Sequence, residues 1–186
     1  LGRIGEKASS LAVPALMKAL GDQDGFMRWH AAKALGEIGE KASSVVQSAV
    51  PALLKALEDR DIVVRYYAAK ALGQIGEKAS SAVPALLKAL GHQDELMRRH
   101  AAEALGRISE KASSAVQSAV PALLKALEDQ DIMVHFYTEQ ALGLIIDEKA
   151  SSAVPVLLKA LGDQDKWVRR HAAKALGQIG EKASSV

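Results

Sequence analysis

The stretch AVPALMKAL at residues 12–20 returns four times along the chain. It reads AVPALLKAL at 49–57, 82–90 and 119–127, and AVPVLLKAL at 153–161. The copies alternate between longer and shorter spacings because the linkers at 41–50 and 111–120 carry an insert that those at 78–83 and 149–154 lack. Self-similarity of this kind is typical of repeat architectures. We predict one domain over 1–186, with repeats at 12–48, 49–81, 82–118, 119–152 and 153–186 and a remnant of a preceding repeat at 1–11.

Each repeat carries the signals of two helices joined by a short loop. A proline falls in the first turn of the first helix, where its missing N–H costs nothing: Pro14, Pro51, Pro84, Pro121 and Pro155. An aspartate suits the N-cap of the second helix: Asp24, Asp61, Asp94, Asp131 and Asp165. A glycine suits its end: Gly39, Gly76 and Gly180. Such a pair cannot bury its apolar stripe alone, so the repeats must stack, and the sequence predicts an all-α solenoid.

Composition narrows the function classes. Hydrophobic residues make up 49% of the chain, but no run approaches the ~18 apolar residues of a membrane span, so we expect no membrane partner. The absence of cysteine removes disulfides and thiolate metal sites, and is compatible with the cytoplasm. A net charge of +2 demands neither nucleic acid nor an anionic surface.

The repeated signature has a family resemblance. DQDKWVRRHAAKALGQIG at 163–180, with AVPALLKAL in the first helices, resembles the HEAT repeats of the phycobilisome-lyase type and the artificial alphaRep-style arrays built on that consensus. The resemblance covers essentially the whole chain. It implies a superhelix whose second helices line the concave side. Its members include scaffolds, bilin lyases, a di-iron hydroxylase and engineered binders, so it leaves the function open.

All seven Phe, Trp and Tyr residues fall in one recurring part of the second helix. At 100° per residue, Met27, Ala31 and Leu35 belong to a core-facing arc, and the variable positions lie opposite. We therefore predict that Trp29, Tyr66 and Phe136 are largely exposed. The predicted partner-binding residues are Phe26, Trp29, His30, Lys33, Val63, Tyr66, Tyr67, Lys70, Leu96, Arg99, His100, Met133, Phe136, Tyr137, Gln140, Trp167, Arg170 and His171. We expect a protein or peptide ligand on the concave face.

An enzyme is not the favoured interpretation. His30, His100 and His171 share one helical position, but helices pack roughly 8–10 Å apart, so these residues cannot approach one ion at the ~2 Å of a ligand bond. The hydroxylase relatives use His-Glu pairs at this place, whereas here each His is followed by Ala. No phosphate loop or nucleophile constellation is present in the sequence. We expect no metal, no cofactor and no catalysis; a lyase- or hydroxylase-related subunit is the third interpretation.

Nucleic acid is the second interpretation, because some HEAT-like proteins hold duplex DNA in their groove. The candidate phosphate contacts are Arg28, Arg65, Arg98 and Arg169. Each belongs to the repeated signature, and in HEAT repeats such an Arg pairs with an Asp in a ladder. The remaining basic residues of the variable arc are too few for a phosphate-tracking surface.

Two histidines depart from the ladder: His92 replaces its Asp in repeat 3, and His135 replaces its Arg in repeat 4. If each Asp pairs with the Arg of the next repeat, the rungs are Asp22 with Arg65, Asp59 with Arg98, and Asp129 with Arg169. His92 and His135 then face each other, which predicts the softest joint between repeats 3 and 4.

Repeat 4 departs further. It has Thr138 and Glu139 in place of Ala-Ala, and LGLIIDEKA at 142–150 is one residue longer than LGQIGEKA at 72–79. We interpret His135 and Glu139, four residues apart, as a pair that satisfies itself. We also expect end-to-end self-association, because Leu1–Gly5 reads as the stub of a second helix and Val186 stops where a further first helix would begin.

Overall fold

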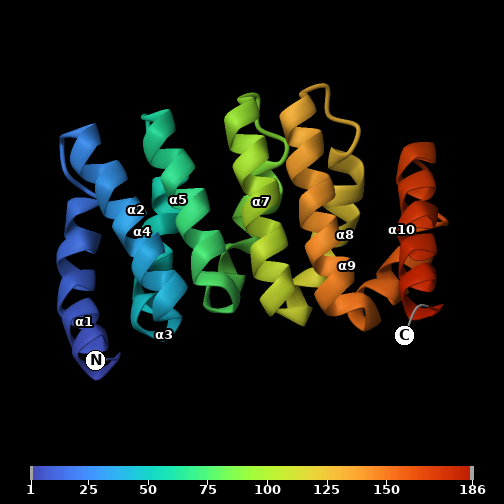
Figure 1. Ribbon diagram of the computed structural model, residues 1–186. Helices are drawn as coiled ribbons and strands as arrows, with labels where there is room; N and C mark the ends of the chain where they lie inside the picture. The colour runs from blue at the N-terminus through green and yellow to red at the C-terminus, as the bar shows by residue number, and fades with distance from the viewer. Residues whose placement is uncertain (1, 185–186) are drawn as a thin grey trace.

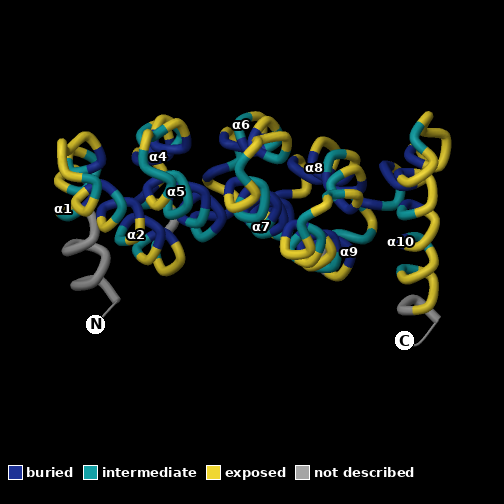
Figure 2. The backbone as a smooth tube through the Cα atoms, turned by 90° about the horizontal axis from the view of Figure 1, so that it is seen from above, coloured by how far each residue is buried: buried dark blue, intermediate teal, exposed yellow. Residues whose placement is uncertain are grey.

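The computed structural model describes residues 2–184, with the side chains of 11–42, 44–147 and 149–181. Helices stack side by side in two layers (Figures 1 and 2). One layer holds first helices: α1 (Gly2–Ala19), α4 (Val50–Ala56), α6 (Val83–Ala89) and α8 (Ser113–Ala126). The other holds second helices: α2 (Gly25–Lys41), α5 (Ile62–Ile75), α7 (Glu95–Lys111) and the start of α9 (Ile132–Ala160), with α10 (Lys166–Ser184) at the C-terminal end. Short helices α3 (Ser43–Val46), η1 (Gln47–Ala49) and η2 (Gly76–Ala82) connect the layers. The predicted all-α solenoid is confirmed.

The second helices begin at the predicted aspartates. Asp24, Asp61, Asp94, Asp131 and Asp165 each accept a hydrogen bond of 2.8–3.0 Å from the backbone N–H two residues later. The residue two before each cap also accepts from the N–H of the cap, which fixes the loop that enters the helix. The local signals of the sequence therefore set every second-helix start.

Helix ends follow the sequence less closely. Gly76 ends α5 with φ 67°, as predicted, whereas Gly39 and Gly180 lie inside α2 and α10. A Cβ on Gly39 would stand 3.4 Å from Ile75 Cα, so this glycine serves close packing with the next second helix. The fourth second helix has no such end either: α9 continues into the first helix of repeat 5, with non-helical angles at Lys149.

The prolines fall in two settings. Pro51 and Pro84 lie in the first turn of α4 and α6, as predicted. Pro14, Pro121 and Pro155 lie inside longer helices, against that prediction. In α8 the turns before the proline bury Val116 and Ala119 completely, and this packing supports the helix despite the hydrogen bond that proline cannot make.

The core runs without interruption between the two layers, and Figure 2 shows the buried segments where they meet. Leu35, Leu72 and Leu105 of the second helices are completely buried. Met27 was expected in the same core but is 49% exposed, whereas its equivalent Met97 is 2% exposed. The preceding repeat covers Met97. No preceding second helix among the described residues covers Met27 in the same way.

Successive second helices approach closely where a glycine faces an alanine. A Cβ placed on the glycine would stand 2.9, 3.0 and 2.7 Å from the alanine Cα in the pairs Gly36 with Ala71, Gly73 with Ala104, and Gly106 with Ala141. The fourth joint is different: a Cβ on Gly143 meets no neighbouring heavy atom of the described residues within 4 Å. The joint between α9 and α10 is therefore more open than the three before it.

Repeat 4 supplies the reason for this opening. Glu139 stands where the other repeats before it have Ala32, Ala69 and Ala102, all completely buried against the next repeat. A glutamate cannot enter that contact, and its side chain is 47% exposed. It reaches instead across the joint to Lys174 of α10, with an Oε1 to Nζ distance of 3.5 Å. A cleft of about 300 Å³ lies beside it, floored by Leu127, Leu142 and Ile146.

The ion-pair ladder runs in the direction opposite to the predicted one. Arg28 pairs with Asp59 at 2.8 Å and Arg98 with Asp129 at 2.6 Å, so the Arg of one repeat reaches the Asp of the next. The predicted rungs, Asp22 with Arg65, Asp59 with Arg98 and Asp129 with Arg169, are wrong. Each guanidinium also donates to carbonyls of its own loop, and this turns its remaining N–H groups toward the following repeat.

His92 and His135 therefore belong to different joints, and the predicted facing pair is wrong. His92 Nδ1 accepts from Asp94 N at 3.0 Å, at the joint with repeat 2. His135 Nδ1 donates to Leu127 O at 2.7 Å, and its Nε2 lies 3.7 Å from Glu139 Oε1, so the two predicted partners lie near each other but the histidine is satisfied by the carbonyl. The reason given for a soft joint between repeats 3 and 4 is thereby removed. Of the two chain ends, Leu1 and Val186 lie outside the described residues.

A second ion pair ties repeat 3 to repeat 4. Arg99 donates from Nε and Nη2 to both oxygens of Asp131, at 3.0 and 2.9 Å. These bonds hold the pKa of the Asp131 carboxyl at about 2, below its ordinary 3.8. Burial, the largest single influence on Asp129, opposes its ionised form, but the hydrogen bonds and charge of Arg98 together with the backbone N–H of Asp131 outweigh it, and the pKa of Asp129 is lowered too.

Glycine substitutions test the spacing between helices. Gly106→Ala is expected to destabilise, because a clash with the backbone of Ala141 costs roughly 1–3 kcal/mol and exceeds the gain in helix propensity of about 1 kcal/mol or less. Gly143→Ala has open space and is expected to stabilise by about 0.5–1 kcal/mol. Urea unfolding measures both. Equal effects of the two substitutions would contradict a close third joint and an open fourth one.

Acid unfolding tests the second ion pair. Because the folded pKa of Asp131 lies below its unfolded value, its contribution to stability is present above about pH 4 and is lost as the pH falls toward about 2. Arg99→Gln should lower Tm near pH 6 and make the fall of Tm between those pH values shallower. Lys33→Gln, which removes an exposed pair with Glu37, should leave the Tm curve nearly unchanged. A fall as steep in Arg99→Gln as in the parent chain would show that Asp131 is not linked to folding.

Candidate functional site

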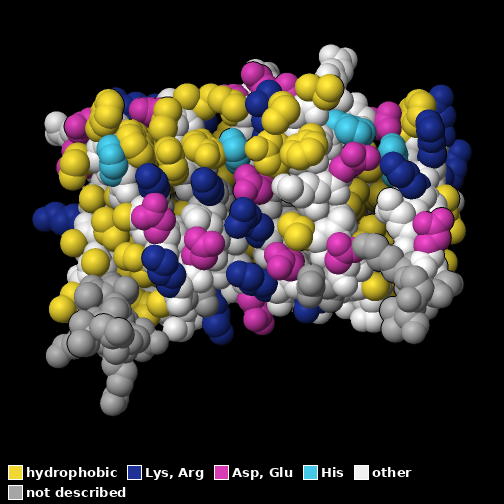
Figure 3. All heavy atoms as spheres, in the orientation of Figure 1, with side chains coloured by type: hydrophobic (Ala, Val, Ile, Leu, Met, Phe, Trp, Pro, Cys, Tyr) yellow, Lys and Arg dark blue, Asp and Glu magenta, His cyan; other side chains and the backbone are white. Residues whose placement is uncertain are grey.

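The second helices place one exposed apolar side chain of every repeat in the same position. These residues are Phe26, Val63, Leu96, Met133 and Trp167, which are 67, 40, 37, 37 and 36% exposed. Each follows the capping aspartate by two residues, so the caps that start the helices also fix this position. Figure 3 shows the resulting band of hydrophobic and His side chains across α2, α5, α7 and α9.

Below this first position, aromatic rings contact one another from helix to helix. Trp29 stacks on His30 at 3.5 Å between ring centroids and on Tyr67 of α5 at 5.0 Å. Tyr66 lies 4.6 Å from Tyr67 and 4.0 Å from His100 of α7. The two distances to Tyr67 fall in the range of favourable ring pairs, about 4.5–7 Å, and the two His contacts are closer still.

The chain of rings ends in repeat 4. His100 lies 6.2 Å from Tyr137 of α9, and Phe136 meets Tyr137 edge to face at 5.5 Å. We call the aromatic surface the first four members of the exposed row together with these rings: Phe26, Trp29, His30, Val63, Tyr66, Tyr67, Leu96, His100, Met133, Phe136 and Tyr137. It spans the second helices of four repeats.

Trp29, Tyr66 and Phe136, the three rings predicted to be largely exposed, differ in their exposure. Phe136 is 52% exposed, as predicted, whereas Trp29 and Tyr66 are half-buried. Trp29 also packs against the core, whereas His30, another predicted partner-binding residue, is exposed. The helical angle placed these residues on the correct side of the helix, but the next helix lies close enough to cover two of the rings.

Charged residues border the aromatic surface, and most of them are paired. Lys33 lies 3.8 Å from Glu37, and Arg107 lies 3.2 Å from Glu103. Glu103 also contacts His100 Nδ1 at 3.4 Å, and this hydrogen bond lowers the pKa of Glu103. Lys70 lies 5.9 Å from the centroid of the Tyr66 ring. Arg99, predicted to meet a partner, is instead held by Asp131 and is only 21% exposed in its side chain.

Repeat 5 carries a separate group. The cations of Lys166 and Arg170 lie 5.0 and 5.5 Å from the Trp167 ring centroid, so this ring is flanked by positive charge. His171 Nε2 lies 2.7 Å from Glu128 Oε1 in the turn that follows α8 of repeat 4. Trp167, Arg170 and His171 occupy the same helical positions as the aromatic surface. Within the described residues, the chain of ring contacts ends at Tyr137 and Phe136 and does not reach them.

The sequence did not indicate that Arg99 and His171 are held by acidic residues of other repeats. Their partners are the capping Asp131 and Glu128, which stand on either side of the ladder residue Asp129. No helix within the described residues is long and apolar enough to cross a membrane. Nor do the described side chains gather three His, Asp or Glu in a metal-binding group.

Comparison with known proteins gives the family. The model for HEAT repeats matches residues 1–50, 50–129 and 120–185, so the chain belongs to the HEAT-repeat family. No curated protein sequence matches the chain.

Solved structures agree with this assignment. An engineered protein is similar over 90% of this chain and 79% of its own, with 30% identity and a TM-score of 0.65. The complex of CpcE and CpcF of phycocyanin lyase from Nostoc sp. PCC7120 is similar over 89% of this chain and 64% of the matched one, at 29% identity and a TM-score of 0.60. A structure of Kap95p with RanGDP, at 18% identity, TM-score 0.61 and coverage of 94 and 24%, shows the fold alone.

Two alanine substitutions separate packing from exposure within the aromatic surface. Trp29→Ala removes a ring held between His30 and Tyr67 and should destabilise by roughly 1–3 kcal/mol. Phe26→Ala removes an exposed ring and should change stability by about 0.5 kcal/mol or less. Urea unfolding followed by circular dichroism measures both values. A larger loss in Phe26→Ala would mean that the burial order of the two rings is reversed in solution.

Proposed function

We propose that the chain is a non-catalytic scaffold that binds a protein or peptide through the aromatic surface. The observation that carries this proposal is the row of exposed apolar side chains, one per repeat, beside a continuous chain of packed rings. Exposed apolar rows of this kind mark interaction sites more often than scattered single residues do. Tyr and Trp are also among the commonest energetic centres of interfaces.

The packing of the rings supports binding. Trp29, Tyr67 and Tyr137 are partly buried against the core, so their conformations are fixed before a ligand arrives. Fixed side chains lose little entropy on binding, which favours affinity. Phe26 and Phe136 project further and offer area that a ligand would cover.

The spacing of the second helices suggests the form of the ligand. Packed helices lie roughly 8–10 Å apart. A peptide in the extended polyproline II conformation advances about 3.1 Å per residue and repeats every three residues, so every third side chain would face the array and meet a new repeat. We propose an extended segment with apolar side chains at that interval, lying across the second helices on the concave side.

The charges favour this ligand over nucleic acid. Arg28 and Arg98 are held by ladder aspartates, Arg99 by Asp131, and Lys33 by Glu37. A phosphate backbone would need these cations unpaired. The similarity to phycocyanin lyase subunits raises an enzymatic alternative, and the His residues that would serve such chemistry, His100 and His171, contact acidic residues in separate repeats.

Selection from a displayed library of random peptides tests the proposal. Binders should lose roughly 2–4 kcal/mol of affinity for the double variant Phe26→Ser with Phe136→Ser, while its Tm changes little. Leu158→Ser, at a 57% exposed leucine in the first helix of repeat 5, is the matched control and should leave affinity unchanged. Titration calorimetry measures both affinities. Peptides that bind the double variant as tightly as the parent chain would overturn the proposal.

A further inference from the structure

The ladder arginines hold a carboxylate in one fixed way. Arg28 donates from Nε and Nη2 to the two oxygens of Asp59, at 2.8 and 2.9 Å. Arg98 does the same to Asp129, at 2.6 and 3.0 Å. In both, Nη1 donates to carbonyls of the arginine's own loop. The edge formed by Nε and Nη2 is therefore a two-pronged site for a carboxylate.

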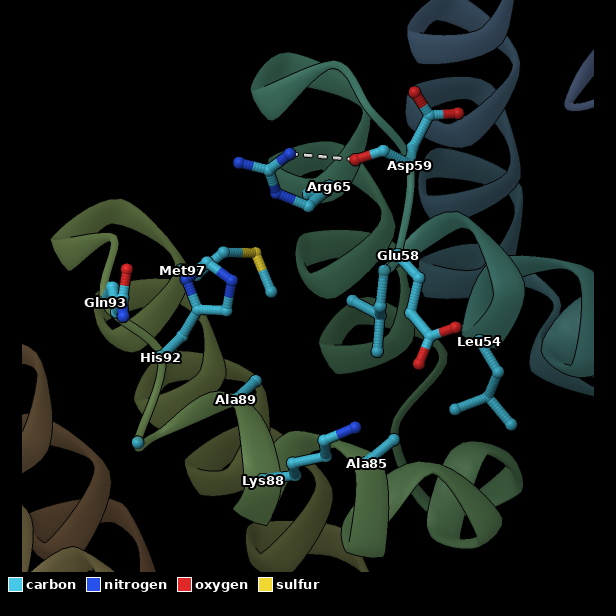
Figure 4. Close-up of a pocket in the computed structure, with 12 residues that line it drawn as sticks. Leu54, Glu58, Asp59, Arg65, Ala85, Lys88, Ala89, His92, Gln93 and Met97 are labelled. Carbon is cyan, nitrogen blue, oxygen red and sulfur yellow. Dashed lines mark hydrogen bonds between the residues drawn. The ribbon is translucent and has the colours of Figure 1, made fainter.

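Arg65 is anchored to its own loop in the same way, but no aspartate stands at the ladder position of the next repeat. Its Nη1 donates to the backbone carbonyl of Asp59 at 2.8 Å, the bond drawn in Figure 4. Its Nη2 reaches Oδ2 of the capping Asp94 at 3.2 Å. Its Nε is buried and has no hydrogen-bond partner among the described residues. A buried unpaired N–H is costly, so this edge favours an acceptor.

His92 is the cause. It occupies the place of the ladder aspartate in repeat 3, and its Nδ1 accepts from the N–H of Asp94. The neutral ring thus carries its proton on Nε2 and offers a donor. The substitution preserves the loop and removes both oxygens that would have met Arg65.

A pocket of about 610 Å³ lies at this position, between repeats 2 and 3. Figure 4 shows Arg65, His92 and Met97 on one side of it and Leu54, Ala85 and Lys88 on the other. The volume falls in the range of small-molecule sites, roughly 300–1,000 Å³. Asp59 also borders the pocket, but its carboxylate is held by Arg28.

We propose that this pocket binds a carboxylate carried on a short aliphatic chain. One oxygen would accept from Nε–H of Arg65 and the other from the second N–H of Nη2, whose first N–H is held by Asp94. The chain would lie among Leu54, Leu57 and Met97. Lys88 adds a positive charge and His92 Nε2–H a donor, whereas Glu58 at the same pocket disfavours groups with more than one negative charge. A singly charged planar group therefore fits better than a phosphate. The site shares no residue with the aromatic surface, so this proposal and the proposed function can be disproved independently.

The direct test is a titration with hexanoate, followed by NMR of the arginine Nε–H signals. The Arg65 signal should shift and saturate, whereas those of Arg28 and Arg98, whose Nε groups are already bonded, should stay in place. Hexanamide, which has the same chain without the charge, should bind at least about tenfold more weakly. An unchanged Arg65 signal up to roughly 50 mM hexanoate, far above the ~1 mM expected for such a fragment, overturns the proposal.

Two substitutions at one position give a matched comparison. His92→Asp restores the carboxylate of the ladder and should weaken hexanoate binding by at least about tenfold while raising Tm. His92→Asn keeps the acceptor for Asp94 N–H without the charge, and should bind hexanoate within about threefold of the parent chain. Equal binding by the two variants, each checked for folding by circular dichroism, would refute the site.

The source of the carboxylate is decided by a second pair of probes. An acetylated tripeptide ending in leucine with a free carboxyl terminus is compared with its C-terminal amide. If the acid competes with hexanoate and the amide does not, a chain terminus is a ligand of the site. If hexanoate alone binds, the ligand is a free carboxylic acid.

Discussion

The spacing of the second helices of the first four repeats depends on a close contact between a glycine of one helix and an alanine of the next. With Gly36 against Ala71, and the two equivalent contacts after it, no side chain keeps the helices apart, so they approach nearly to backbone contact. This approach brings Trp29 within ring contact of Tyr67, and Tyr66 within contact of His100. The aromatic surface is therefore a product of the smallest residues in the chain as much as of the largest.

The same spacing makes the ion-pair ladder possible. Each rung needs a guanidinium that is anchored in its own loop and a carboxylate that the next loop presents at a fixed distance. Position 92 shows that the loop and the rung are separable, because a histidine completes the turn while Arg65 keeps a single ion pair, from Nη2 to the capping Asp94, and its Nε has no acceptor among the described residues. A repeat can thus change the partner of a structural arginine without losing its local fold, and this is how an array of similar units can acquire a chemically distinct place.

Features encoded within one repeat could be predicted from the sequence. The capping aspartates and Gly76 act on their own helix, and the structure has them where expected. Features that depend on a neighbour could not. The helical angle gave the correct side for Trp29 but not its burial, since a wheel contains no information about the distance to the next helix. The direction of the ladder was missed for the same reason: the spacing of Asp22 and Arg28 is equal whichever neighbour the arginine reaches.

The open joint between α9 and α10 has a mechanical consequence. Three joints are fixed by close backbone contact. At the fourth, Val168 and Ala172 of α10 are buried in the core, and ion pairs of long side chains, Glu139 to Lys174 and Glu128 to His171, also span the joint. Ion pairs between long side chains tolerate changes of angle that packed backbones do not. The second helices of the first four repeats are therefore held at fixed spacings, and the position of α10 is less tightly fixed. We expect the distance from Phe136 to Trp167 to change with the tilt of α10, so the exposed apolar side chain of repeat 5 is less firmly placed than those of the first four repeats.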